Sequence, residues 1–69
     1  MTLGQRISLY RKKLNISQEE LGARLGVSRQ AVSKWESGAS DPSTSNLLAL
    51  AKLYGVSAED LLRVAAGGE

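Results

Sequence analysis

The sequence predicts an all-α fold, a compact domain of five short helices, and three observations support this prediction. Apolar side chains recur at intervals of three and four residues along most of the chain, which places them on single helix faces. Serine or threonine precedes most of these segments and glycine follows three of them, as expected of helix caps. No segment shows the strict alternation of apolar and polar residues that marks a half-buried strand.

The first helix is expected over residues 2–14. Thr2 and Gln5 fit a capping box at its start. Its apolar stripe consists of Leu3, Ile7, Tyr10 and Leu14. Three cations in a row, Arg11-Lys12-Lys13, lie in the last turn, where the helix dipole favours positive charge. Two roles fit this cluster, either helix termination with added solubility or contact with phosphate.

The stretch from Gln18 to Ser37 is expected to form two short helices joined by a tight turn. Ser17 can cap the first of them, and Gly26 can adopt the left-handed conformation that ends it. Ser28 can cap the second. Gly22 costs about 1 kcal/mol of helix propensity relative to alanine, which a helix accepts most easily where another helix approaches closely. The inward face of the pair consists of Leu21, Leu25, Val32 and Trp35. This pattern is typical of a helix-turn-helix.

A fourth helix is expected between the cap Ser43 and the terminating Gly55. Its buried stripe consists of Leu47, Leu50, Ala51 and Tyr54. Leu48 and Leu53 flank that stripe, which makes this the most apolar helix and predicts a central position for it.

Ser57 can cap a fifth helix, to which Leu61 and Leu62 supply the apolar contacts. The small and polar residues 65–69 have nothing to anchor them and are expected to form a flexible tail. The folded domain is therefore expected to cover residues 1–64.

Composition excludes several classes of function. The chain has no cysteine and no histidine, so a disulfide framework, a conventional zinc site and a Cys/His nucleophile pair are excluded. The longest apolar run, residues 47–51, is far shorter than the roughly 20 residues that cross a bilayer. We expect a soluble cytoplasmic protein that is not an enzyme, with no metal or other cofactor, no small-molecule ligand and no membrane contact.

Charge is unevenly distributed along the chain. Residues 1–35 carry seven basic and two acidic side chains, whereas residues 36–69 carry two basic and five acidic ones. Because the basic half holds the helix-turn-helix, this polarity suits a polyanionic partner. An ordinary solvated surface is the alternative, since a charged fraction of 23% is average.

The order and spacing of these segments resemble the Cro/C1-type, or XRE, helix-turn-helix family of phage and bacterial regulators. The resemblance covers nearly all of residues 1–63 and rests on SQEEL at 17–21, LGVS at 25–28 and QAVSKWESG at 30–38. It implies a lambda-repressor-like domain that binds double-stranded DNA, as a homodimer on a palindromic operator. It also implies a role in transcription regulation, as a repressor.

The second helix of such a motif enters the major groove with its N-terminal residues toward the bases. With Val32 and Trp35 facing inward, the residues left to read the bases are Ser28, Arg29, Gln30, Ser33 and Lys34. Arg29 can donate twice to guanine and Gln30 can pair twice with adenine, each contact discriminating by about 1–3 kcal/mol. The alternative is that these are plain surface residues at a helix start.

Phosphate contacts are expected at two further helix starts. The resemblance places Gln18 against a DNA phosphate beside the first amides of its helix, unless Gln18 merely follows a good cap. Ser40 and Ser43 can bind a phosphate in the same way at the start of the fourth helix. Asp41 departs from the more basic sequences of the family at this loop and would repel phosphate unless it points away.

The resemblance also pairs Arg11 with Glu36 in a partly buried contact that fixes the angle of the second helix of the motif. It further presents Arg11 toward the phosphate backbone. The alternative is two independent surface charges.

A different class of function is a protein-interaction module, such as an antitoxin-like partner that uses the same fold with weak DNA affinity. The apolar patch that would serve it, or serve a homodimer, consists of Leu53, Leu61, Leu62 and Val64.

Overall fold

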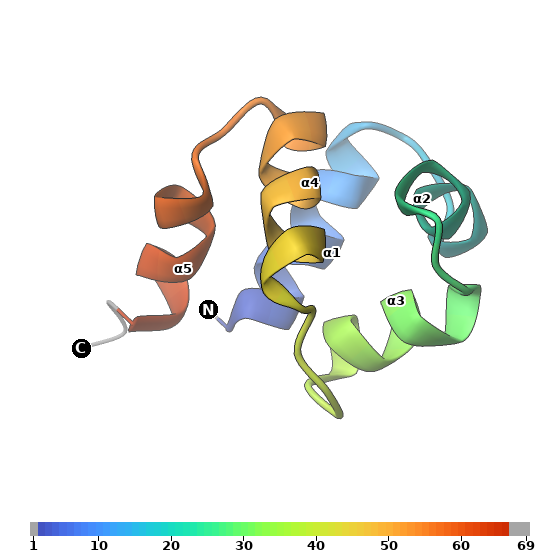
Figure 1. The fold of residues 1–69 in the computed structure, drawn as a ribbon, viewed down its shortest axis with the longest axis horizontal. Helices are drawn as coiled ribbons and strands as arrows, with labels where there is room; N and C mark the ends of the chain where they lie inside the picture. The colour runs from blue at the N-terminus through green and yellow to red at the C-terminus, as the bar shows by residue number, and fades with distance from the viewer. Residues whose placement is uncertain (1, 67–69) are drawn as a thin grey trace.

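The computed structural model describes residues 2–66, with side chains through Leu62, and these residues form five α-helices without a strand. The helices are α1 (Leu3–Lys13), α2 (Gln18–Leu25), α3 (Arg29–Ser37), α4 (Thr44–Tyr54) and α5 (Ala58–Ala66) (Figure 1). The all-α prediction is therefore confirmed. Within the described residues no helix is both long enough and apolar enough to span a bilayer.

The helices are arranged around α1. The helix-turn-helix pair α2 and α3 lies on one side of the molecule and α5 on the other, with α1 and α4 between them (Figure 1). Helix α1 packs against α3, α4 and α5, and α2 packs against both α3 and α4. The expected central position of α4 is confirmed, and α1 shares that position.

Each helix starts at the predicted cap. The cap hydroxyls that accept a hydrogen bond from a backbone amide three residues later belong to Thr2, Ser17, Ser28, Ser43 and Ser57. Each such cap is worth about 1 kcal/mol. Gly26 ends α2 at φ 76°, as predicted for the turn of the motif. Asn15, at φ 60°, turns the chain between α1 and α2 in a conformation that asparagine tolerates better than most residues.

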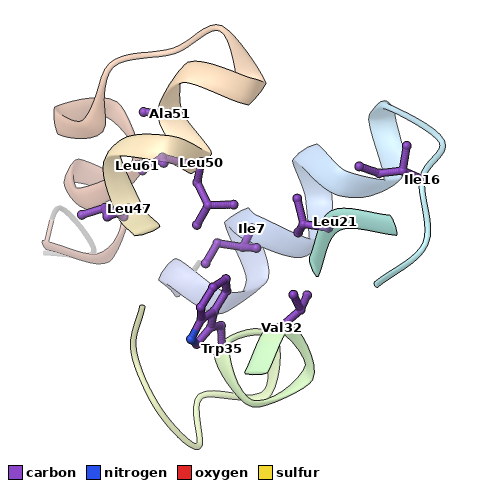
Figure 2. Packing of buried hydrophobic residues seen from close by; sticks show 9 residues of the cluster. All are labelled: Ile7, Ile16, Leu21, Val32, Trp35, Leu47, Leu50, Ala51 and Leu61. Atoms are coloured by element: carbon purple, nitrogen blue, oxygen red, sulfur yellow. The ribbon is translucent and has the colours of Figure 1, made fainter. Parts of the chain in front are cut away.

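The apolar core draws on every helix and on the turn after α1 (Figure 2). Its buried members are Ile7, Ile16, Leu21, Val32, Trp35, Leu47, Leu50, Ala51 and Leu61. Trp35 is only 5% exposed, so the indole is a core residue and not a base-stacking one. The Tyr54 ring stacks on the Tyr10 ring with 5.2 Å between the ring centroids. The Tyr54 hydroxyl donates a hydrogen bond to the Ile7 carbonyl oxygen at 3.0 Å.

Three expectations of the sequence analysis differ from the structure. Leu14 is 43% exposed, because it caps the C-terminus of α1 and Ile16 fills the core after the turn. Leu62 is 46% exposed, because the side chain of Leu61 next to it takes the inward direction and adjacent helical residues point about 100° apart. Helix α5 continues through Ala66, two residues into the expected tail, and residues 67–69 lie outside the described residues.

Two buried glycines bring backbone segments close together. A Cβ on Gly22 would lie 2.7 Å from the Val27 carbonyl oxygen, so the backbone does approach Gly22 closely, but the turn before α3 makes this contact and not another helix as expected. Gly4 was not singled out from the sequence. A Cβ there would overlap the Trp35 carbonyl oxygen and lie 2.8 Å from that of Glu36. Gly4 therefore sets how closely α1 packs on the end of α3.

Candidate nucleic-acid interface

The outer face of α3 presents the residues that were predicted to read bases. Ser28, Arg29, Gln30 and Lys34 are exposed, and Ser33 is half-buried. The opposite face is held in the core, where Val32 is fully buried and Trp35 nearly so. Among the described residues, no ion pair and no side-chain hydrogen bond engages Arg29 or Gln30. Both side chains can therefore turn toward a partner without breaking an existing bond.

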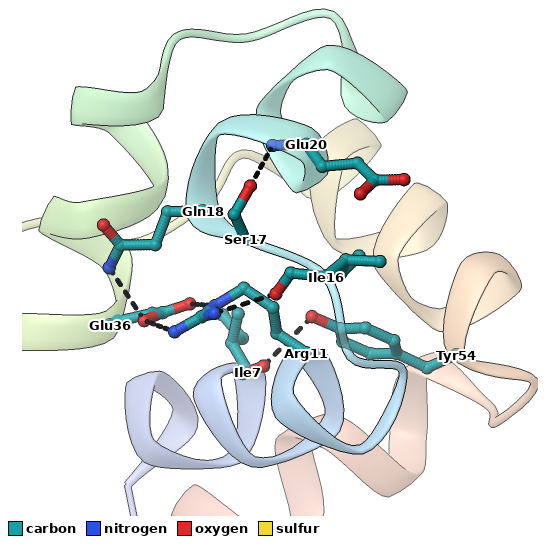
Figure 3. A network of polar contacts seen from close by, with 8 residues as sticks. All are labelled: Ile7, Arg11, Ile16, Ser17, Gln18, Glu20, Glu36 and Tyr54. Carbon is teal, nitrogen blue, oxygen red and sulfur yellow. Dashed lines mark hydrogen bonds and ion pairs between the residues drawn. The ribbon is translucent and has the colours of Figure 1, made fainter.

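Arg11 and Glu36 form the predicted pair between α1 and α3 (Figure 3). Arg11 Nε donates to Glu36 Oε2 at 2.7 Å, and Arg11 Nη2 donates to Glu36 Oε1 at 3.1 Å. The two side chains are 12% and 9% exposed, so the contact is largely shielded from water. A fork of two parallel bonds constrains orientation as well as distance, and this one fixes α3 against α1.

The pair is charged at neutral pH. Burial by itself raises the pKa of the Glu36 carboxyl, but hydrogen bonds from Arg11 and Gln18, together with the positive charges of Arg11 and Lys12, outweigh it and hold that pKa below its ordinary value. The hydrogen bond to Glu36 raises the pKa of Arg11 above its ordinary value. Arg11 Nη1 also donates to the Ile16 carbonyl oxygen at 2.9 Å, which ties the pair to the turn before α2.

Gln18 takes part in the same network, which was not predicted from the sequence. Its Nε2 donates to Glu36 Oε1 at 3.0 Å, and its side-chain oxygen points away from the carboxylate (Figure 3). One amide hydrogen of Gln18 and two guanidinium hydrogens of Arg11 remain outside these bonds. The phosphate contacts assigned to Gln18 and Arg11 stay predictions, and Arg11 has little exposed surface with which to make one.

The start of α4 also remains a prediction as a phosphate contact. Ser43 Oγ accepts from the Asn46 amide at 3.2 Å, which is a capping bond, and lies 3.4 Å from Ser45 Oγ. Ser40 is exposed in the loop after α3, where its amide donates to the Lys34 carbonyl oxygen at 3.3 Å. Asp41 is exposed beside them, so the negative charge at this edge is accessible to solvent.

A hollow of about 620 Å³, lined mostly by residues with polar side chains, lies between α1 and the flank of α3 that carries Ser33. We call it the α1–α3 hollow, and its lining consists of Gln5, Ser8, Leu9, Lys12, Gln18, Ser33, Glu36 and Ser37. Gln18, Ser33 and Glu36 were predicted from the sequence, whereas the α1 wall was missed. The available signal was the spacing of Gln5, Leu9 and Lys12, which places a second, partly polar stripe on α1.

Comparison with known proteins decides the family. A family model described as helix-turn-helix matches residues 7–61. The chain belongs to the Cro/C1-type helix-turn-helix family. This confirms the resemblance that the segments at 17–38 carry.

Members of this family that are similar to the chain include phage and bacterial regulators. Repressor protein C2 of Salmonella phage P22 is 46% identical over 61 residues, which cover 88% of this chain and 28% of that protein. The P22 c2 repressor in complex with a synthetic operator superposes with a TM-score of 0.84 at 44% identity, covering 88% of this chain and 92% of that chain. SinR in complex with DNA superposes with a TM-score of 0.80 at 34% identity, and the match covers 88% of this chain and 98% of the SinR chain.

These superpositions confirm the expected lambda-repressor-like fold. The chain spans between 28% and 39% of the length of three curated relatives that it matches, including repressor protein C2. The activities of those longer proteins are therefore only proposed for this chain.

Proposed function

We propose that this chain binds double-stranded DNA sequence-specifically, with α3 in the major groove, and that it regulates transcription as a repressor. The observation that carries the proposal is the division of α3 into two faces. Val32 and Trp35 hold one face in the core, while Arg29 and Gln30 stand exposed and unengaged at the N-terminal end of the other. A helix held in this way presents these two side chains to base edges in the docking geometry of the motif. The role is binding without catalysis, in the cytoplasm.

The similarity to two regulators whose structures contain DNA supports this proposal. Two protomers related by a two-fold axis would place two copies of α3 in successive major grooves, so we propose a homodimer on a palindromic operator. The base-reading residues are Ser28, Arg29, Gln30, Ser33 and Lys34. The phosphate contacts proposed with them are Gln18, Arg11, Ser40 and Ser43.

Replacing Arg29 or Gln30 by alanine should relax base preference and leave the fold intact. Each bidentate contact discriminates by about 1–3 kcal/mol, so the loss should appear at one or two positions of the selected site. Binding sites are selected from random duplex DNA with the wild type and with each variant, and the consensus sequences are compared. Lys52→Ala, which removes an exposed cation from α4, serves as the control and should keep the wild-type consensus.

The affinity of the wild type for duplex DNA should also fall steeply as salt is raised, because neutralised phosphates release counterions. An unchanged consensus for both α3 variants would contradict the base-reading assignment. Failure of the wild type to bind any duplex at low salt would overturn the proposed function itself.

A protein-interaction module with weak DNA affinity is the second candidate, and one observation favours it. Leu48 is 55% exposed on α4 and lines an apolar hollow of about 530 Å³ with Ala49, Ala51 and Val56. The patch expected from the sequence is partly wrong, because Leu61 is fully buried. The side chain of Val64 lies outside the described residues. The absence of salt-dependent DNA binding would favour this candidate over the first.

A further inference from the structure

The α1–α3 hollow borders the proposed DNA-reading surface, and its α1 wall has no role in the proposed function. Ser33 lies on the α3 side of the hollow, and Gln18 stands at the start of α2 beside it. Both residues are among the proposed DNA contacts, so a strand that meets them passes the mouth of the hollow. The facing wall comes from α1, where Gln5, Ser8, Leu9 and Lys12 line it.

The charges around the hollow favour an anion. Lys12 is exposed, and within the described part of the chain it forms no ion pair. The one carboxylate in the lining, that of Glu36, is bound by Arg11 at 2.7 Å and by Gln18 at 3.0 Å. Because Arg11 compensates this charge, Lys12 supplies the net charge that an incoming group meets.

The remaining lining residues suit a sugar–phosphate chain better than a free ion. Ser8 and Ser33 offer hydroxyl groups, and Gln5 keeps its amide hydrogens because its oxygen accepts the capping bond from the Thr2 amide at 2.9 Å. Hydroxyl and amide side chains are common donors to DNA phosphate. Leu9 is 37% exposed among them and offers an apolar contact of the kind that a deoxyribose ring can cover.

We propose that the α1–α3 hollow receives the sugar–phosphate backbone of the DNA strand that runs alongside α3, and that Lys12 contacts a phosphate there. The inference rests on the proposed function, because it requires α3 in the major groove. It adds the exposed face of α1 that carries Ser8 and Lys12 to an interface in which α1 otherwise contributes only the largely buried Arg11. Contacts of this kind set register and affinity and carry no base preference.

Lys12→Ala tests this inference, with Lys13→Ala as a matched control. Lys13 has the same charge in the same helical turn, but it does not line the hollow. Its Nζ atom lies 5.7 Å from the centroid of the Tyr10 ring. Affinity for a selected duplex and for a random duplex is measured over a range of salt concentrations. Lys12→Ala should weaken binding to both duplexes to a similar extent. It should also reduce the slope of log affinity against log salt concentration by about 1, whereas Lys13→Ala should change that slope less.

Ser8→Gln separates a strand lying in the hollow from attraction at a distance. The variant adds bulk without charge, so it should weaken binding if the strand enters the hollow, and Lys12→Arg should retain most of the affinity. Equal losses for Lys12→Ala and Lys13→Ala, or a wild-type slope for Lys12→Ala, would overturn the inference while leaving the proposed function intact. A wild type that binds no duplex would instead overturn the proposed function. Melting temperatures confirm that each variant is folded before its affinity is compared.

Discussion

Glu36→Ala is expected to destabilise the domain by about 3–5 kcal/mol, because it leaves the Arg11 guanidinium largely buried without its carboxylate. A domain of this length has a total stability on the order of 3–10 kcal/mol, so much of the protein would unfold on mild heating. The same change also removes the acceptor for Gln18. The free energy of unfolding is measured by urea titration of wild type and variant.

Glu20→Ala provides the matched control for this change. Glu20 pairs with Arg24 at 2.8 Å, but both side chains are 47% exposed, so solvent screens the pair. Its loss should cost less than about 1 kcal/mol. A Glu36→Ala variant that is no less stable than Glu20→Ala would show that the buried pair does not hold α3 in place.

The Glu36 interaction should also make stability depend on pH in the acid range. The folded-state pKa of Glu36 is lowered, so its contribution is fully present above the unfolded value of about 4.3 and is lost as the pH falls through the folded value. Wild type should therefore lose more stability on acidification than Glu36→Ala does. Parallel curves for the two proteins below pH 5 would contradict the network in Figure 3.

Gly4→Ala is expected to destabilise the protein by more than about 2 kcal/mol, even though alanine normally stabilises a helix by about 1 kcal/mol relative to glycine. The physical reason is that a Cβ at this position would overlap the Trp35 carbonyl oxygen, and backbone atoms cannot move aside as a flexible side chain can. The end of α3 would have to shift away from α1. Urea unfolding gives the stability, and a DNA-binding titration shows whether the displaced α3 still recognises its site.

Gly26→Ala is the control for the glycine substitution itself. Gly26 is left-handed at φ 76°, and among the described residues nothing lies within 4 Å of a Cβ built there. The cost at Gly26 is therefore backbone strain alone, about 1–2 kcal/mol, without displacement of a helix. If Gly4→Ala proved as stable as wild type, the close packing of α1 on α3 would be wrong.

Local patterns were sufficient for the existence of the helices and for the caps at which they start, but not for the end of α5. The serine and threonine caps and the left-handed Gly26 act through bonds within four residues, so they can be identified from neighbouring positions. The same patterns failed at Leu62, where helical spacing alone does not show which of two adjacent apolar residues faces the core, and at Leu14, which lies at the end of its helix. The left-handed Asn15 sends Ile16 inward in place of Leu14, and no spacing rule anticipates that turn.

The proposed site was predictable in part. The exposed face of α3 follows directly from the inward direction of Val32 and Trp35, and the Arg11–Glu36 pair came from the family resemblance. The bond from Gln18 to the same carboxylate was not expected, because it joins residues 18 positions apart whose distance depends on the angle between α2 and α3.

The chain by its own residue order specifies the all-α class, the caps at which the helices start and the side of α3 that faces outward, since all of these depend on interactions between near neighbours. Three other features depend on how separate helices pack. They are the close contact of Gly4 with the end of α3, the hydrogen bonds from Arg11 and Gln18 to Glu36, and the α1 wall of the hollow. Packing is decided by contacts between residues distant in sequence, so these features exist only once the five helices have come together. They are also the features that place Lys12 beside the base-reading helix, where the proposed interface gains its second wall.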